Sequence, residues 1–195
     1  MFVTAPVYNE QWYSESELAM LEAAAAFVKP LIGAIIEIGC WEGRSAAVIV
    51  NACYLEVLIA VDTWAGSISE HPDHDTVRIA QARDVFAAFS ANMQSATRGN
   101  LDCHRTESVA FLRSWTAPIK FCHIDAAHDY DSVRETIELF LPRLVPGAVL
   151  FGHDYQSAHA GRVDLNGGVE RAVRATLPAW VTRGNNWYYV NMQSP

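Results

Sequence analysis

Two short motifs carry the residues best suited to catalysis. Asp125 and His128 stand in "HIDAAHDY", and Asp154 stands in "GHDY"; both motifs overlap the end of an apolar run. If these runs are neighbouring strands of a parallel sheet, the two carboxylates meet at one edge and can bind a divalent cation such as Mg²⁺. His128 then faces the same space, where an imidazole suits the task of a general base. The alternative is that His128 is a surface histidine of a loop.

A glycine turn, Gly39-Cys40-Trp41-Glu42-Gly43, follows an earlier apolar run. The dinucleotide fingerprint G-x-G-x-x-G needs a glycine where Trp41 stands, and no Gly-Lys-Ser/Thr follows as a phosphate loop requires. Glu42 and the preceding Glu37 repel a phosphate, and Glu37 suits a ligand that carries an amine. The turn therefore predicts a ligand other than a pyrophosphate.

Asp62 ends the next apolar run, 19 residues after Gly43. An acid at this place in a parallel α/β sheet accepts hydrogen bonds from ribose hydroxyls. A ligand with a ribose, an ammonium group and no phosphate describes S-adenosylmethionine. The alternative is that Glu37 only caps or solvates a strand end and that Asp62 only begins a loop.

Apolar runs alternate with amphipathic segments along the chain, which predicts a doubly wound α/β fold with a mostly parallel sheet covered on both faces. Near the C-terminus, two strand-like runs flank Gly184-Asn185-Asn186 and predict an antiparallel hairpin with a three-residue turn. We expect strands at 34–38, 57–61, 101–105, 121–125 and 148–152, and helices at 18–28, 44–53, 75–95, 108–115, 131–144 and 168–177.

The length of 195 residues predicts one domain, with an N-terminal helical cover (1–30), a cofactor and active-site core (35–177) and a closing hairpin (178–195). The two longest polar loops are expected at 66–75 and 156–167. The histidine-rich part of the first, 71–75, is predicted to lie near the substrate rather than to bind a metal.

Composition excludes several classes of function. The net charge of −8 disfavours a nucleic-acid partner and an anionic membrane surface. Charged residues and a proline interrupt the longest apolar stretch, so we expect no transmembrane span, and the N-terminus shows no signal-peptide pattern. Four cysteines without CxxC spacing predict buried free thiols and a cytoplasmic protein. Whether the chain forms a homo-oligomer is left open.

The motifs "EIGCWEGRSA", "VDTWAGS", "CHIDAAHDYDSVRETIELFLPRLVPGAVLFGHDY" and "GVERAVRATL" resemble those of class I S-adenosylmethionine-dependent methyltransferases, and in particular the branch of the macrocin O-methyltransferases. The resemblance covers residues 35–177. It implies a Rossmann-like, seven-stranded sheet whose last strands form an antiparallel hairpin.

The resemblance also implies roles for individual residues in cofactor binding. Glu37, Gly39 and Gly43 line the methionine end, and Ser45 belongs to the same cofactor-binding set. Asp62 holds the ribose, with Thr63 and Trp64 beside the adenine and Ser108 on its other side, and Asp125 is expected to reach the cofactor as well as a metal. In parts of the branch a second acid follows the metal-binding Asp of the fifth strand; Tyr155 stands there in this chain, which leaves Glu42 as a weakly supported third ligand.

The sequence thus predicts an S-adenosylmethionine-dependent methyltransferase that acts on a hydroxyl of a small molecule such as a sugar or polyol. His128 is expected to be the general base and Asp125 a second catalytic residue; whether a divalent metal held by Asp125 and Asp154 assists the reaction is left open. A nicotinamide-dependent oxidoreductase, a non-catalytic S-adenosylmethionine-binding protein and a metal hydrolase are the other hypotheses.

Overall fold

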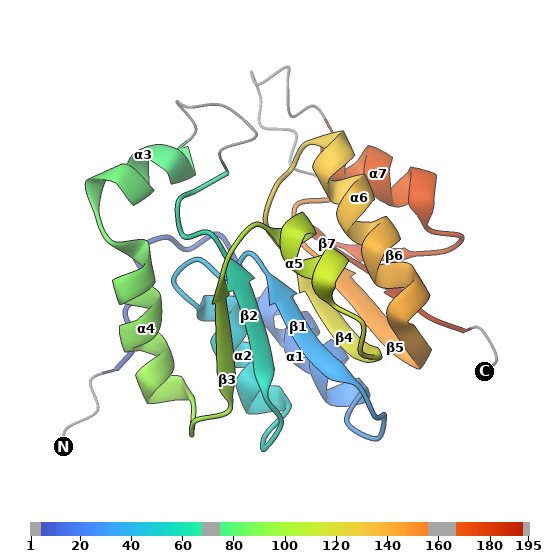
Figure 1. Ribbon diagram of the computed structural model, residues 1–195, viewed down its shortest axis with the longest axis horizontal. Helices are drawn as coiled ribbons and strands as arrows, with labels where there is room; N and C mark the ends of the chain where they lie inside the picture. Colours follow the sequence, from blue (N-terminus) through green and yellow to red (C-terminus); the bar gives the residue numbers. More distant parts are fainter. Residues whose placement is uncertain (1–4, 68–74, 156–166, 193–195) are drawn as a thin grey trace.

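The fold is an α/β sandwich built on one central sheet (Figure 1). The computed structural model describes residues 5–67, 75–155 and 167–192. Within these ranges, no helix is long and apolar enough to cross a membrane.

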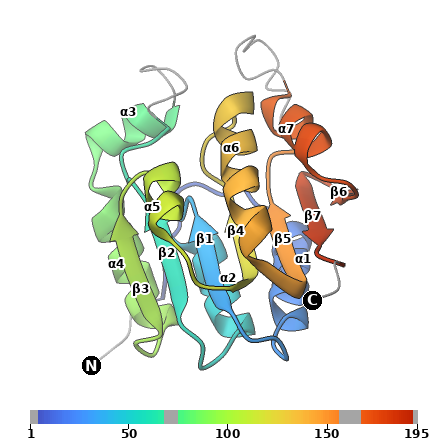
Figure 2. The same ribbon diagram turned by 45° about the vertical axis from the view of Figure 1, so that its right-hand side comes forward.

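Seven strands form the sheet in the order β3-β2-β1-β4-β5-β7-β6, which Figure 2 shows side by side. The five strands from β3 to β5 are parallel, and β7 pairs antiparallel with both β5 and β6. The strand order reverses between β1 and β4, which is where open α/β sheets bind their ligands. The strands are β1 (Ala34–Ile38), β2 (Leu58–Asp62), β3 (Leu101–Arg105), β4 (Ile119–Ile124), β5 (Leu144–Gly152), β6 (Val181–Arg183) and β7 (Asn186–Val190).

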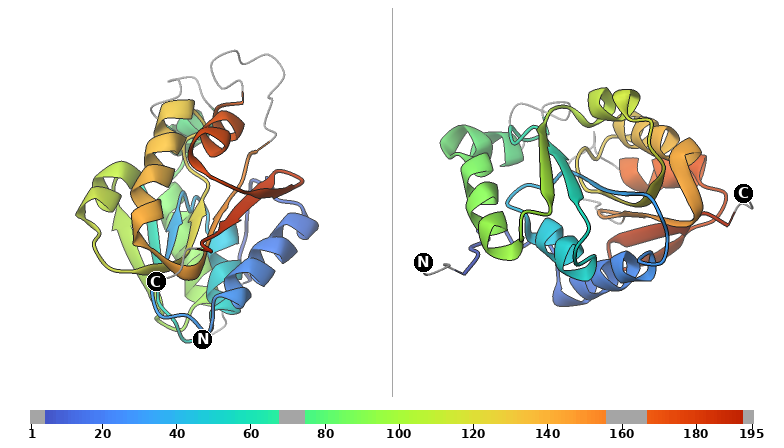
Figure 3. Two further views of the ribbon diagram at one scale, coloured as in Figure 1. Left: turned by 90° about the vertical axis from the view of Figure 1, so that its right-hand side faces the viewer. Right: turned by 60° about the horizontal axis from the view of Figure 1, so that its bottom comes forward.

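Helices cover both faces of the sheet, as the end-on view of Figure 3 makes plain. One apolar core lies between the sheet and α1, α2 and α4, and a second lies between the sheet and α5, α6 and α7. The helices are α1 (Glu15–Phe27), α2 (Arg44–Ala52), α3 (Asp75–Ala82), α4 (Val85–Ala96), α5 (Ser108–Ser114), α6 (Tyr130–Phe140) and α7 (Gly168–Thr176), with a 3₁₀ turn at Leu141–Arg143.

The start of α1 is fixed by a capping box. The Ser14 side chain accepts a hydrogen bond from the Glu17 backbone, and the Glu17 carboxylate accepts one from the Ser14 backbone. Because both end groups are satisfied, the helix begins sharply at Glu15. The preceding segment, residues 7–14, lies along the edge of the sheet where the parallel strands end. We call it the N-terminal strap.

The structure confirms the predicted fold class, the closing hairpin and the order of the elements, and it corrects four details. The helix predicted at 75–95 is two helices, because Asp84 caps a new helix by accepting a hydrogen bond from the Ala87 backbone. The hairpin turn has two residues rather than three, since Arg183 pairs with Asn186. β4 ends at Ile124, so Asp125 lies just beyond the strand in which it was expected. All four cysteines are free, but Cys103 is exposed on the edge strand β3.

Candidate active site

A cavity of about 510 Å³ opens at the carboxyl ends of the parallel strands. Its walls come from the residues that follow β1, β2, β3, β4 and β5, together with the start of α3. The cavity therefore lies at the reversal of strand order between β1 and β4. Its lining residues are Trp12, Ile38, Gly39, Trp41, Val61, Asp62, Thr63, Gly66, Ser67, Asp75, Thr76, Thr106, Glu107, Ser108, Asp125, Ala126, Ala127, His128, His153, Asp154 and Asn185.

The glycine turn is tightly packed against the end of β4. Gly39 has a φ of +84°, and a Cβ at this position would lie 2.0 Å from the Asp125 carbonyl oxygen. Only glycine provides both the left-handed backbone and the space for this approach. The turn therefore brings the end of β1 into direct contact with the end of β4.

Asp62 holds the turn in place. Its Oδ2 accepts hydrogen bonds from the backbone N–H groups of Cys40 (2.7 Å) and Trp41 (2.9 Å), and its Oδ1 accepts one from Trp64 (2.6 Å). Burial raises the pKa of Asp62, although these three bonds oppose the shift. A carboxylate has about four acceptor positions, so three of them are used by the backbone and one on Oδ1 remains for a ligand.

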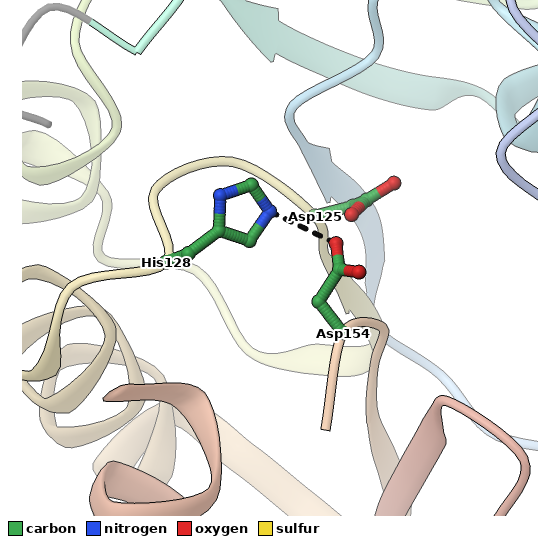
Figure 4. Close-up of side chains that lie close together, drawn as sticks. All are labelled: Asp125, His128 and Asp154. Carbon is green, nitrogen blue, oxygen red and sulfur yellow. Dashed lines mark hydrogen bonds and ion pairs between the residues drawn. The ribbon is translucent and has the colours of Figure 1, made fainter. Parts of the chain in front are cut away.

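Asp125, His128 and Asp154 lie together in the wall of the cavity (Figure 4). One nitrogen or oxygen ligand atom from each residue lies within 4.8 Å of the others. His128 Nε2 is 2.9 Å from Asp154 Oδ2, and the backbone of Asp154 is left-handed with a φ of +58°. The predicted meeting of these three side chains is confirmed, and the set fits a divalent cation because carboxylates bind Mg²⁺ and Mn²⁺ and an imidazole binds transition-metal ions.

The two carboxylates of this cluster have opposite pKa shifts. Burial alone would raise the pKa of Asp154, but the hydrogen bonds from His128 and His153 outweigh it and hold the pKa well below its ordinary value. Burial raises the pKa of Asp125, and the negative charge of Asp154 adds to this shift against the opposing histidines. At neutral pH, Asp154 is therefore the more firmly ionised of the two.

Glu37 does not line the cavity. Its side chain is 0 % exposed, and its Oε1 lies 2.9 Å from Nδ1 of His123, its register partner on β4. Tyr13 continues this buried chain: its hydroxyl is 3.2 Å from His123 Nε2 and 2.6 Å from Asp125 Oδ2. The expectation that Glu37 lines the methionine end of the cavity is thus wrong, because strand pairing turns the carboxylate towards His123 beneath the site; a contact with the cofactor stays a prediction.

Three other predicted cofactor residues lie away from the cavity wall. Gly43 packs against Phe89 and Met93, and Ser45 is buried in α2. Trp64 is buried against aromatic side chains of α4, and its ring N–H donates to the Trp41 carbonyl. These residues support the turn from behind. Gly39, Asp62, Thr63, Ser108 and Asp125, by contrast, do line the cavity as expected.

Glu42 is not placed to be a third metal ligand. Its carboxylate accepts hydrogen bonds from the backbone (2.5 Å) and side chain (2.6 Å) of Asn9 and lies 2.6 Å from Arg83. It therefore holds the N-terminal strap instead. The strap is fixed at a second point by Glu10, which accepts from the Trp41 ring N–H (2.8 Å) and pairs with Arg83 (2.6 Å).

No pattern in the sequence indicated that the N-terminal strap contributes to the site. Trp12 is 48 % exposed, lines the cavity and lies 5.5 Å from Trp41, ring centroid to ring centroid. Tyr13 reaches Asp125 across 112 positions of the chain. His153 lies beneath the site with a ring 4.1 Å from that of Tyr13, centroid to centroid, and also reaches the cavity wall. Most of the two polar loops, 68–74 and 156–166, lies outside the described residues.

Comparison with known proteins gives the family. Residues 36–155 match the family model described as a methyltransferase domain. No curated protein matches the chain significantly. Solved structures with the same fold include the O-methyltransferase NovP (13 % identity, TM-score 0.67, covering 90 % of this chain and 79 % of that one) and TomG from Streptomyces achromogenes, involved in tomaymycin synthesis (17 %, 0.63, 92 % and 81 %). CalS11, a TDP-rhamnose 3′-O-methyltransferase, is a third (14 %, 0.61, 92 % and 80 %).

The sheet order and the cavity at its carboxyl edge are those of the class I S-adenosylmethionine-dependent methyltransferases. Since the family model covers more than half of its length, the chain belongs to the methyltransferase domain family. The closer likeness to macrocin O-methyltransferases stays a prediction.

Proposed function

We propose that this methyltransferase transfers a methyl group to a hydroxyl oxygen of an uncharged small molecule, such as a sugar or another polyol. The observation that carries the proposal is the presence of Asp125, His128 and Asp154 in the same cavity as the glycine turn. Three proteins of the same fold, NovP, CalS11 and TomG, are described as O-methyltransferases, which supports this reaction.

S-adenosylmethionine fits the cavity because two of its groups are cationic. Five carboxylates line the wall, and the sulfonium and ammonium groups of the cofactor complement them electrostatically. In this arrangement the open position on Asp62 Oδ1 accepts one ribose hydroxyl. Thr63 and Ser108, on the neighbouring wall, are the proposed contacts of the nucleoside.

The reaction forms a bond between the acceptor oxygen and the methyl carbon while the carbon–sulfur bond breaks, which leaves S-adenosylhomocysteine. The hydroxyl proton goes to His128. Asp154, held ionised, orients the imidazole through its 2.9 Å contact and stabilises the positive charge that develops there. Because the methyl group is already activated in the cofactor, the protein's main contribution is to position the two reactants.

A divalent cation is the alternative partner of the cluster. When bound, such a cation acts as a Lewis acid that favours the ionised form of a coordinated hydroxyl. Asp125, Asp154 and His128 would hold it, and His128 would then be a ligand rather than the base. The two alternatives predict opposite responses to a chelator.

The negative charge of the cavity limits the kinds of acceptor molecule that can bind. Asp62, Asp75, Glu107, Asp125 and Asp154 line it, whereas no lysine or arginine is found among its described lining residues. A phosphate would meet repulsion here without a cationic partner. We therefore propose a neutral acceptor rather than a sugar nucleotide. The free thiols and the net charge of −8 support a cytoplasmic enzyme without a nucleic-acid or membrane partner.

Calorimetry tests the proposal first. S-adenosylhomocysteine should bind to the purified protein and NAD should not; binding of NAD alone would favour the oxidoreductase instead. Turnover of S-adenosylmethionine is then measured by mass spectrometry with methyl glycosides, catechol and TDP-rhamnose as acceptors. Preference for TDP-rhamnose would contradict the neutral acceptor.

The variant His128→Ala should bind S-adenosylhomocysteine normally but lose about 10²- to 10⁴-fold in turnover. The control is Tyr188→Phe, because Tyr188 packs on Phe151 and does not line the cavity. Loss of turnover in EDTA, restored by Mg²⁺ or Mn²⁺, indicates the cation alternative. Full turnover in EDTA indicates that His128 and Asp154 act without a divalent cation. Equal turnover of His128→Ala and the parent protein would remove His128 from the mechanism.

A further inference from the structure

Among the described residues of the N-terminal strap, only Tyr13 has a side chain that hydrogen-bonds to the cluster of Asp125, His128 and Asp154. Its hydroxyl lies 2.6 Å from Asp125 Oδ2, while Asp125 Oδ1 lies 3.8 Å from His153 Nδ1, beyond hydrogen-bond range. The tyrosine ring is buried and lies 4.1 Å from the His153 ring. Tyr13 thus fixes one oxygen of Asp125 and leaves the other oriented towards the cluster.

The direction of the hydrogen bonds follows from counting protons. A tyrosine hydroxyl has one proton, so if it donates to Asp125 it must accept at its other contact, 3.2 Å away at His123 Nε2. His123 then carries a proton on Nε2. Its Nδ1 shares one further proton with Glu37 Oε1 at 2.9 Å, either as an imidazolium with a carboxylate or as a neutral ring with a carboxylic acid.

Both forms of the buried pair have the same effect on the tyrosine. The Nε2 proton points at the Tyr13 oxygen, and the Tyr13 proton is directed to Asp125. Glu37 and His123 are both fully buried and outside the cavity wall. This role explains why two polar side chains occupy the central strands β1 and β4, whose other residues are mostly apolar.

We infer that Tyr13 is a positioning residue that holds Asp125 in the orientation required to bind a divalent cation, with the His123–Glu37 pair setting the direction of its hydrogen bond. The inference rests on the cation alternative of the proposed function. Partners of this kind orient metal ligands, and removing one typically lowers metal affinity about 10- to 100-fold. The Tyr13 hydroxyl bonds to Asp125 and not to the glycine turn, so we expect its loss to affect the cation site more than cofactor binding.

The experiment measures Mn²⁺ binding by electron paramagnetic resonance, in the presence of saturating S-adenosylhomocysteine. Tyr13→Phe removes the hydroxyl but keeps the ring over His153, and it should weaken Mn²⁺ binding by about tenfold or more. Its affinity for S-adenosylhomocysteine should stay within about twofold of the parent value, because the bonds of Asp62 to the glycine turn are untouched. Tyr13→Met is the second variant, since methionine fills the space flexibly without a hydroxyl.

The control is again Tyr188→Phe, which should bind Mn²⁺ like the parent protein. If the parent protein binds Mn²⁺ and both Tyr13 variants bind it equally well, the inference is wrong while the cation site stands. If the variants lose S-adenosylhomocysteine as well, Tyr13 has a general structural role and the inference is also wrong. If the parent protein does not bind Mn²⁺, the cation site of the proposed function fails and the inference falls with it.

Discussion

Replacing Gly39 by alanine measures how closely the turn after β1 packs against the end of β4. The structure offers a matched control in Gly99, because both glycines have a φ of +84°. A Cβ at Gly99 would meet nothing within 4 Å, whereas a Cβ at Gly39 would lie 2.0 Å from the Asp125 carbonyl oxygen and 2.8 Å from the Ala126 Cα. The two variants therefore differ in the packing of the new methyl group and share the backbone strain.

The expected costs follow from these contacts. The left-handed backbone costs an alanine about 1–2 kcal/mol at either position. The reduced entropy of the unfolded chain, about 0.4–1 kcal/mol, also applies to both and cancels in the difference. At Gly39 the backbone of β4 must move away, and overpacking of this kind adds about 1–3 kcal/mol. We therefore expect Gly39→Ala to be less stable than Gly99→Ala by about 1–3 kcal/mol.

Urea unfolding of the two variants and the parent protein gives both free energies, provided that the m-values agree. Gly39→Ala should also bind S-adenosylhomocysteine more weakly, because the movement displaces Asp125 and the turn together. Gly99→Ala should bind it normally, since Gly99 lies outside the cavity wall. Equal unfolding free energies for the two variants would refute the close packing of the turn.

Three further predictions test other parts of the site. Burial alone would lower the pKa of His153, but its bond to Asp154 and the nearby carboxylates raise it. In metal-free protein the stabilising contribution of the His153 charge is therefore complete below the ordinary histidine pKa of about 6.5 and is lost as the pH rises through the raised pKa. His153→Asn should accordingly lower the free energy of unfolding more at pH 6 than at pH 9, as measured by urea unfolding. Glu42→Ala removes the acceptor of Asn9 and one of the two partners of Arg83, which keeps Glu10, so it should destabilise the protein by about 1–3 kcal/mol and speed proteolysis of the N-terminal strap; an unchanged cleavage rate would contradict this. Asp62→Asn keeps one oxygen but loses acceptors for the turn, so its affinity for S-adenosylhomocysteine should fall about tenfold by calorimetry.

The central part of the sheet could be predicted from the sequence because strands such as β1, β2 and β4 are buried on both faces. A strand such as β4 is apolar along most of its length, and runs of this kind stand out from the amphipathic helices between them. The break between α3 and α4 was missed for a local reason. Asp84 is a good helix cap, but the apolar pattern continues through it, and the pattern alone predicts one helix.

The site could be predicted only where strand ends define it. Asp125 and Asp154 follow adjacent parallel strands, so their meeting required no knowledge of side-chain direction. Glu37 was misplaced because its environment depends on the register of β1 against β4, which sets it beside His123. The role of Tyr13 could not be predicted at all, since nothing in the sequence specifies a contact between residues so far apart in the chain.

The N-terminal strap has a consequence for the order in which the protein folds. The bonds of Asp62 to the glycine turn close a loop of about 22 residues, whereas Tyr13 must find Asp125 across 112 positions and Glu17 must find Asn185 across 168. Contacts between distant residues form late because the chain entropy of closing them is lost before they stabilise anything. The cofactor turn can therefore assemble while the chain is still being synthesised. The bond between Tyr13 and Asp125 must wait until β4 has emerged, although Tyr13 is made 112 residues before its partner.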